Sequence, residues 1–173
     1  YAETQEVQLP DGTIVTLNAN SSISVDNDPT ASLRQVRLSG EAFFNVAEDT
    51  TRTFIVYANT MKVRVTGTSF NVSTRSEKTE VVLATGHVIL ESSNLAEPIS
   101  MEPGDRVAYN EANQDLQQQK VVTDQYTSWR DRVYYFQEAS LEEVATTIEN
   151  YYGTRVQLEE GLSELTFTAK VTL

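Results

Sequence analysis

The chain has 173 residues, of which 39% are hydrophobic, so it can bury one good core or one medium and one small core. Its 25 acidic and 13 basic residues give a formal net charge of −12, which repels phosphate backbones and disfavours DNA and RNA binding. The absence of cysteine excludes disulfides, thiolate zinc sites and cysteine nucleophiles. No stretch approaches the roughly 20 apolar residues that cross a bilayer. From the lack of such a stretch, and from a first residue, Tyr1, that is not methionine, we expect a soluble piece of a longer protein.

The first strands are expected as a hairpin. Val7–Leu9 and Thr13–Leu17 alternate apolar and polar residues on either side of Pro10-Asp11-Gly12, where Pro fixes φ and Gly supplies a positive φ. A turn is expected at Asp26-Asn27-Asp28-Pro29. Further strand patterns follow at Ser22–Val25, Val36–Leu38, Ala42–Val46, Phe54–Tyr57 and Met61–Val65.

One short phrase recurs along the chain. It reads Gly40-Glu41-Ala42-Phe43-Phe44-Asn45-Val46, then Gly67-Thr68-Ser69-Phe70-Asn71-Val72, with a looser third copy at Leu83–Leu90. Each copy lies in a strand-turn-strand stretch, which predicts a stack of short β-units.

More strands are expected at Thr79–Ala84, His87–Leu90 and Arg106–Tyr109, the last after a turn at Pro103-Gly104-Asp105. The polar stretch Asn113–Lys120 contains three consecutive glutamines and predicts an exposed loop. About ten short strands favour a mainly β fold, a many-stranded β-sandwich or an irregular β-stack, over residues 1–127.

A second, small α+β module is expected over residues 128–173. Val133–Phe136 has the pattern of a strand, and Ser140-Leu141-Glu142-Glu143 has that of a capping box that starts a helix. Gly153 is expected to end this helix in a left-handed conformation. The apolar stripe of the helix, predicted as ordinary core, comprises Leu141, Val144, Ala145, Ile148, Tyr151 and Tyr152. Two strands, Arg155–Leu158 and Leu165–Val171, complete a βαββ order.

The residues that could carry chemistry mostly favour structural roles. His87 is the single histidine and is expected to be a hydrogen-bonded structural residue in an apolar strand. Asp26 and Asp28 resemble the start of a calcium loop, but the Gly and the distal Glu of such a loop do not follow. No glycine opens a helix in a phosphate-binding pattern. We therefore predict no catalytic residue, no metal and no cofactor, and a protein that is not an enzyme.

The aromatic residues near the module boundary allow two interpretations. Trp129 either binds a sugar or a protein partner, or packs at the junction and holds the two modules together, and the second is favoured. Tyr134 and Tyr135 alternate, so one should face the core and the other solvent.

These phrases, taken in order, resemble the extracytoplasmic region of FecR-type anti-sigma factors, particularly Bacteroidetes-like members. The resemblance covers nearly the whole chain. After Ser128-Trp129-Arg130-Asp131 it continues into a module that is similar to the short signalling domain of secretins and TonB-dependent transporters, here without that domain's second helix and last strands. The phrases that carry the resemblance include Leu9–Thr13, Leu38–Val46, Val65–Val72, Pro103–Asp105 and Ser140–Ala145.

The resemblance implies a periplasmic domain of an inner-membrane protein. Such a domain binds the signalling domain of an outer-membrane TonB-dependent transporter and thereby regulates an extracytoplasmic-function sigma factor. The sigma factor would bind a cytoplasmic segment, joined by a transmembrane helix, and both are outside this sequence. Tyr134, Arg155 and Gln157 are the candidate partner contacts, since the edge of the Arg155–Leu158 strand could accept a strand of the partner. The alternative is a carbohydrate-binding β-sandwich of a glycan-utilisation system, with a glycoside hydrolase third.

Overall fold

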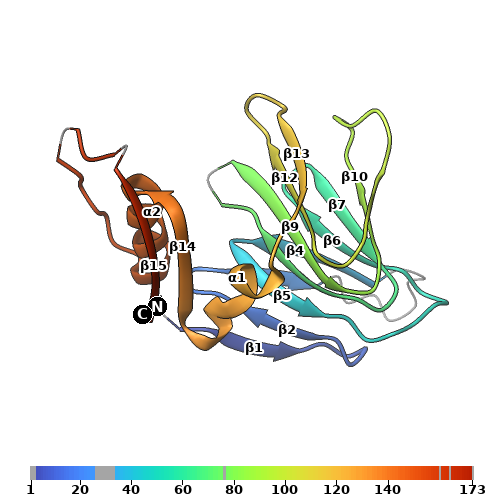
Figure 1. Cartoon of the computed structure of the whole chain (residues 1–173). Coiled ribbons are helices and arrows are strands. Elements are labelled where there is room, and N and C mark those ends of the chain that lie inside the picture. Colours follow the sequence, from blue (N-terminus) through green and yellow to red (C-terminus); the bar gives the residue numbers. More distant parts are fainter. Residues whose placement is uncertain (1–2, 26–33, 76, 160, 164, 173) are drawn as a thin grey trace.

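The computed structural model describes residues 3–25, 34–75, 77–159, 161–163 and 165–172. Two large β-sheets pack face to face, and a small ribbon with one helix lies at one end (Figure 1). This arrangement confirms the expected fold class, a mainly β sandwich followed by a small α+β segment.

The first sheet has seven antiparallel strands in the order β1-β2-β5-β8-β9-β12-β13. The predicted hairpin is confirmed, because β1 pairs antiparallel with β2 and the Gly12 amide closes the turn onto the Leu9 carbonyl at 3.0 Å. The strands are β1 (Gln5–Gln8), β2 (Ile14–Leu17), β5 (Glu41–Asn45), β8 (Ser69–Ser73), β9 (Lys78–Thr85), β12 (Asp105–Asn110) and β13 (Leu116–Lys120).

The second sheet has six strands in the order β11-β10-β7-β6-β4-β3. Its strands pair antiparallel except β4 and β6, which are parallel. The strands are β3 (Ser22–Val25), β4 (Arg34–Ser39), β6 (Phe54–Ala58), β7 (Met61–Val65), β10 (Val88–Glu91) and β11 (Ile99–Met101).

The recurring phrase explains the centre of the core. Its first two copies form β5 and β8, which are neighbours in the seven-stranded sheet, and Phe44 pairs with Phe70 across them. The two rings stack with centroids 5.2 Å apart, and both side chains are fully buried between the sheets. The two copies of the phrase therefore correspond to two adjacent strands, each with a phenylalanine that faces the core.

A short helical segment follows the sandwich and leads into the ribbon. It consists of α1 (Thr123–Thr127) and the 3-10 helix η1 (Ser128–Asp131), together called the strap below. The boundary that we propose between residues 127 and 128 falls inside this strap. The sequence did not predict α1.

The C-terminal module comprises β14 (Val133–Ser140), α2 (Leu141–Tyr152) and β15 (Thr166–Thr172). The capping box is confirmed: the Glu143 amide donates to Ser140 Oγ at 3.2 Å, and the Ser140 amide donates to Glu143 Oε2 at 2.9 Å. Gly153 ends the helix with φ of 66°. Ala145 and Tyr151 of the predicted stripe are buried, whereas Tyr152 is 54% exposed, because no described element covers that side of the helix.

Three sequence-based expectations are wrong. Residues 116–120, expected in a loop, form β13, because their backbone pairs with β12 even though every side chain is exposed. Arg155–Leu158 forms no strand, since β14 pairs with β15 directly. His87 is exposed and precedes β10, so its expected place inside an apolar strand is wrong, although it does have a hydrogen-bond partner, Ser100 Oγ, 3.4 Å from its Nε2. The strand β11 was not predicted, and the turn expected at Asp26–Pro29 lies outside the described residues.

Candidate partner-binding site and its junction with the sandwich

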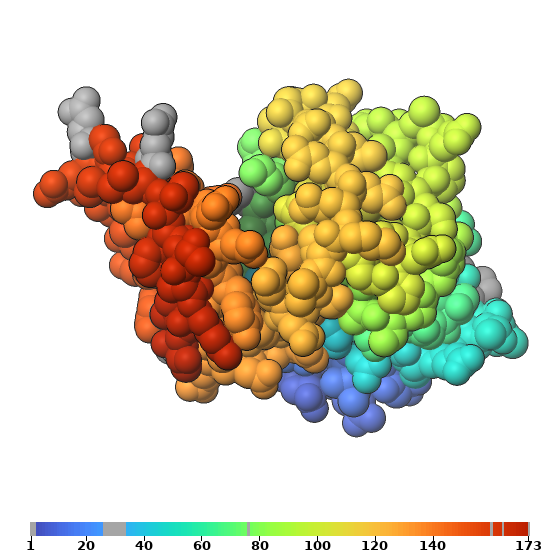
Figure 2. All heavy atoms as spheres, in the orientation of Figure 1, coloured from blue at the N-terminus to red at the C-terminus, as the bar shows by residue number. Residues whose placement is uncertain are grey.

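The C-terminal module forms a lobe beside the sandwich (Figure 2). Its ribbon is a two-stranded antiparallel sheet, so each strand has one edge without a strand neighbour in the described chain. The strand β14 also packs against η1. The outer edge of β15 is therefore the one further from the strap, and its backbone N–H and C=O groups can pair with another chain.

Exposed apolar side chains concentrate on this lobe. Six large hydrophobic residues are exposed in the described part of the chain, and four of them lie here: Tyr135 (40%), Tyr152 (54%), Leu165 (53%) and Phe167 (39%). Such a group on a small surface is typical of an interaction site. The alternation predicted for the tyrosine pair is confirmed, because Tyr135 is exposed and Tyr134 is half-buried.

The three candidate contacts fall in two places. Tyr134 lies on β14 and turns toward the sandwich, with its ring 5.9 Å from that of Tyr151 in an edge-to-face arrangement. Arg155 and Gln157 are both exposed in the irregular segment after α2. Arg155 and Gln157 thus belong to the open surface of the lobe, whereas the Tyr134 side chain belongs to its base.

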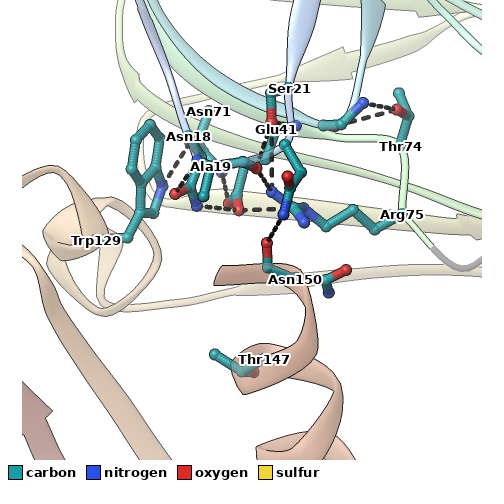
Figure 3. Close-up of polar contacts among 12 residues, drawn as sticks. Asn18, Ala19, Ser21, Glu41, Asn71, Thr74, Arg75, Trp129, Thr147 and Asn150 are labelled. Atoms are coloured by element: carbon teal, nitrogen blue, oxygen red, sulfur yellow. Dashed lines mark hydrogen bonds and ion pairs between the residues drawn. The ribbon is translucent and has the colours of Figure 1, made fainter. Parts of the chain in front are cut away.

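A cluster of polar residues lies where the lobe meets the seven-stranded sheet (Figure 3), and we call Asn18, Glu41, Asn71, Arg75 and Trp129 the junction cluster. The Trp129 indole donates to Asn71 Oδ1 at 3.1 Å, and the Asn71 amide donates in turn to Glu41 Oε1 at 3.0 Å. The amide of Asn18 donates to the second oxygen, Glu41 Oε2, at 2.8 Å. Both oxygens of the carboxylate are therefore used, and the chain of bonds runs from the sheet to the strap.

Arg75 adds a charge to this cluster. Its Nε lies 3.8 Å from Glu41 Oε2, and its guanidinium donates to the Ala19 carbonyl at 2.7 Å. The Glu41 and Arg75 side chains are only 18% and 15% exposed. A pair this far from water contributes little net stability, but removal of one member leaves the other charge without its partner in a poorly solvated place.

Burial shifts the pKa of Glu41 and of Arg75 in the junction cluster, and that of Tyr134 in the adjoining cleft. It raises the pKa of Glu41 above its ordinary value, although hydrogen bonds from Asn71 and Asn18 and the charge of Arg75 oppose the rise. It lowers the pKa of Arg75, against the opposing effect of Glu41. Burial, helped by the negative charge of Glu41, also raises the pKa of Tyr134 to about 12. The phenol of Tyr134 thus stays neutral beside the carboxylate.

The strap is held on the outer face of the seven-stranded sheet by aromatic contacts as well. The guanidinium of Arg130 lies 3.9 Å from the ring centroid of Phe43, and that of Arg106 lies 5.5 Å from the ring of Tyr126. Trp129 is only 4% exposed, so the expectation that it packs at the junction is confirmed.

A second contact connects the sandwich to the helix of the lobe. Asn20, held at φ of 53°, donates from its side chain to the carbonyl of Asn150 near the end of α2 at 2.6 Å. Between this contact and the strap remains a cleft of about 210 Å³, whose lining includes Glu41, Arg75 and Tyr134. The Asn20–Asn150 contact and the strap therefore lie on either side of a polar cleft between the lobe and the sandwich.

Sequence reasoning did not identify Asn18, Glu41, Asn71 or Arg75 as a group. The repeated phrase contains polar residues in both copies, and two of them, Glu41 in the first copy and Asn71 in the second, belong to the cluster. Those two side chains point outward from adjacent strands, away from the stacked phenylalanines.

The described residues contain no group of three or more His, Asp or Glu side chains that could hold a metal ion. The Asp26 and Asp28 pair lies outside the described residues.

Comparison with known proteins identifies the architecture. A family model described as FecR protein matches residues 2–89, and a second, described as FecR, C-terminal, matches residues 133–172. The chain belongs to the FecR family. The resemblance to FecR-type anti-sigma factors inferred from the sequence is thus confirmed, and the second match coincides with the β14–α2–β15 module.

Two solved structures share the fold of this FecR-family chain. One is a crystal structure at 1.65 Å of a protein from Parabacteroides distasonis ATCC 8503 described as a "putative anti-sigma factor", 27% identical with a TM-score of 0.90. The match covers 99% of this chain and 82% of that one. A second crystal structure with the same description and source, at 2.50 Å, is 28% identical with a TM-score of 0.88, covering 98% and 80% of the two chains. No curated protein shows significant similarity to the chain.

None of the helices in the described ranges is long and apolar enough to cross a membrane.

Proposed function

We propose that this chain is the periplasmic signalling region of a transmembrane FecR-family anti-sigma factor, and that its C-terminal module binds the signalling domain of an outer-membrane TonB-dependent transporter. The family membership supports the anti-sigma role. The observation that carries the partner surface is the coincidence of exposed apolar side chains and an unpaired strand edge on one small lobe.

Strand addition is the mode of binding that this lobe favours. A strand of the partner that pairs with β15 would extend the ribbon through backbone hydrogen bonds, and side chains near the edge would supply specificity. Phe167 and Leu165 lie on or next to β15, so their exposed surface would be buried by such a strand. Arg155 and Gln157 are the proposed polar contacts on the open surface, and Tyr134 is the proposed β14 residue that responds to the partner from the cleft at the base of the lobe.

Signalling requires that the partner binds two arrangements of the protein with different affinity. The contacts at the junction can differ between the two arrangements, because Tyr134 lies on β14 and its side chain also lines the cleft around Glu41. A partner that shifts the ribbon would therefore change the contacts of the junction cluster, and the strap would pass this change to the sandwich. On this proposal the lobe receives the signal and the junction transmits it toward the membrane and the sigma factor.

Calorimetry with matched variants tests the proposed surface. The titrant is the isolated signalling domain of a TonB-dependent transporter from the same organism. Phe167→Ser and Arg155→Glu should each weaken binding at least about tenfold, which corresponds to about 1.4 kcal/mol. Leu116→Ser is the control, since Leu116 is 38% exposed on β13 of the sandwich and should leave binding unchanged. Equal affinity for all three variants would exclude the lobe as the partner surface.

A further inference from the structure

The two sheets of the sandwich differ in what covers their outer faces. The strap packs on the outer face of the seven-stranded sheet, whereas no described helix lies on the outer face of the six-stranded sheet. One row of side chains crosses the four central strands of that open face. The row consists of Arg37 on β4, Tyr57 on β6, Lys62 on β7 and Glu91 on β10, each in register with the next.

Two cations of this row gather on one aromatic ring. The Arg37 guanidinium lies 4.7 Å and the Lys62 ammonium 5.9 Å from the ring centroid of Tyr57. Both cations are exposed, and Glu91 at the end of the row pairs with Arg64 at 2.7 Å. The chain as a whole has a net charge of −12, but this row is positive at Arg37 and Lys62 and negative only at Glu91. Its first three residues therefore attract negative charge, and its last residue attracts positive charge.

The row reads cation, aromatic, cation, anion. If a second row is laid against it in the reverse order, each residue faces one that attracts it. Consider two copies of the chain stacked with these faces together, related by a two-fold axis that lies between them, parallel to the strands and midway between β6 and β7. This axis reverses the order of the strands in the second copy but keeps each residue at the same height along its strand. Arg37 would then face Glu91 of the second copy, and Tyr57 would face Lys62 of the second copy. Each of the four facing pairs is attractive, as an ion pair or a cation–π pair.

We propose that the outer face of the six-stranded sheet is an interface between two copies of this chain, arranged by this two-fold axis. The neighbouring row is compatible with it: Gln35, Ile55, Arg64 and Ile89 are in register across the same strands. The axis places Gln35 opposite Ile89 and Arg64 opposite Ile55, which is only 7% exposed, so no two cations of this row lie directly opposite each other. An acidic peptide fits the face less well, because it would meet Glu91 as well as the cations.

The interface is small, which sets its expected strength. Neighbouring strands lie about 4.8 Å apart, so the four strands that carry the row span only about 14 Å. A contact of this size belongs with weak and transient associations. Because its pairs lie at an exposed surface, the dimer should weaken as the salt concentration rises.

Sedimentation equilibrium of the intact chain at low and high salt tests this proposal. Wild type should associate to a dimer at low salt. Arg37→Glu places two carboxylates opposite each other, and Glu91→Arg places two cations opposite each other, so each variant alone should have a dissociation constant at least about tenfold higher. Arg52→Glu makes the same change of charge on an exposed ion pair with Asp49 elsewhere, and it should dimerise like wild type.

The decisive sample is an equimolar mixture of Arg37→Glu and Glu91→Arg. In a mixed pair, the new glutamate at 37 faces the new arginine at 91, while the native Arg37 and Glu91 of the two chains also face each other. The mixture should therefore form a dimer that neither variant forms alone, which also shows that both variants are folded. A wild type that stays monomeric up to millimolar concentration, or a dimer that neither substitution weakens, would overturn the proposal.

Discussion

Trp129→Phe tests whether the junction cluster holds the lobe on the sandwich. The substitution keeps an aromatic side chain in the buried site but removes the indole N–H, which donates to Asn71 Oδ1 at 3.1 Å. Asn71 is itself 1% exposed, so this oxygen cannot find water without a change of structure. Its amide continues to donate to Glu41.

The expected loss of stability follows from Asn71 Oδ1, which loses its hydrogen-bond donor. A buried polar atom left without a hydrogen bond costs about 1–3 kcal/mol, more than the bond itself contributes. We therefore expect the free energy of unfolding to fall by about 1–3 kcal/mol in Trp129→Phe. Trp129→Ala also opens a cavity, and values of about 3–5 kcal/mol are usual for such a change.

Urea denaturation followed by far-UV circular dichroism measures the effect, because the chain has no second tryptophan to report fluorescence in these variants. The control is Tyr126→Phe on the same strap, which should change stability by less than about 0.5 kcal/mol. A double-mutant cycle with Asn71→Ala should give a coupling energy of at least about 0.5 kcal/mol. Additive effects of the two substitutions would refute the claim that Trp129 and Asn71 act together.

Other predictions concern the cap, the buried phenol and catalysis. Ser140→Ala should cost about 1 kcal/mol through the lost N-cap and speed amide exchange after residue 131 selectively; equal acceleration across the sandwich would show that both parts unfold as one. Because the pKa of Tyr134 is raised from 10.0 to about 12, its stabilising contribution is complete below pH 10 and is lost as the pH rises to about 12. Denaturation at several pH values should show a shallower alkaline loss in Tyr134→Phe than in wild type, and identical profiles would contradict this assignment. Hydrolysis of ester, peptide and glycan substrates should be absent; turnover that disappears in a folded His87→Ala variant would contradict it.

Local sequence signals predicted most of the fold. Three features depend only on residues that are close together in the chain: the hairpin around Gly12, the capping box at Ser140 and the left-handed Gly153. The residues that cause each feature are therefore visible in the local sequence. The repeated phrase also indicated β-units, since Phe44 and Phe70 mark the inward face of two strands that prove to be neighbours.

The failures have a different physical origin. All five side chains of β13 are exposed, so no hydrophobic alternation marks it as a strand. It is a strand because its backbone pairs with that of β12, a contact that the local sequence pattern does not predict. Residues 155–158 alternate as a strand would, but they lack a paired neighbour. The junction cluster depends on pairs distant in sequence, such as Glu41 with Asn71 and Trp129 with Asn71, which no spacing rule predicts.

The most direct test of the proposed function is a hydrogen-exchange footprint of the transporter signalling domain on the intact chain. If that domain adds a strand to the ribbon, amides of β15 and the segment 153–159 should gain protection first, and those of the strap should change next. Protection confined to the sandwich, with residues 133–172 exchanging at their free rates, would contradict the claim that the C-terminal lobe receives the signal.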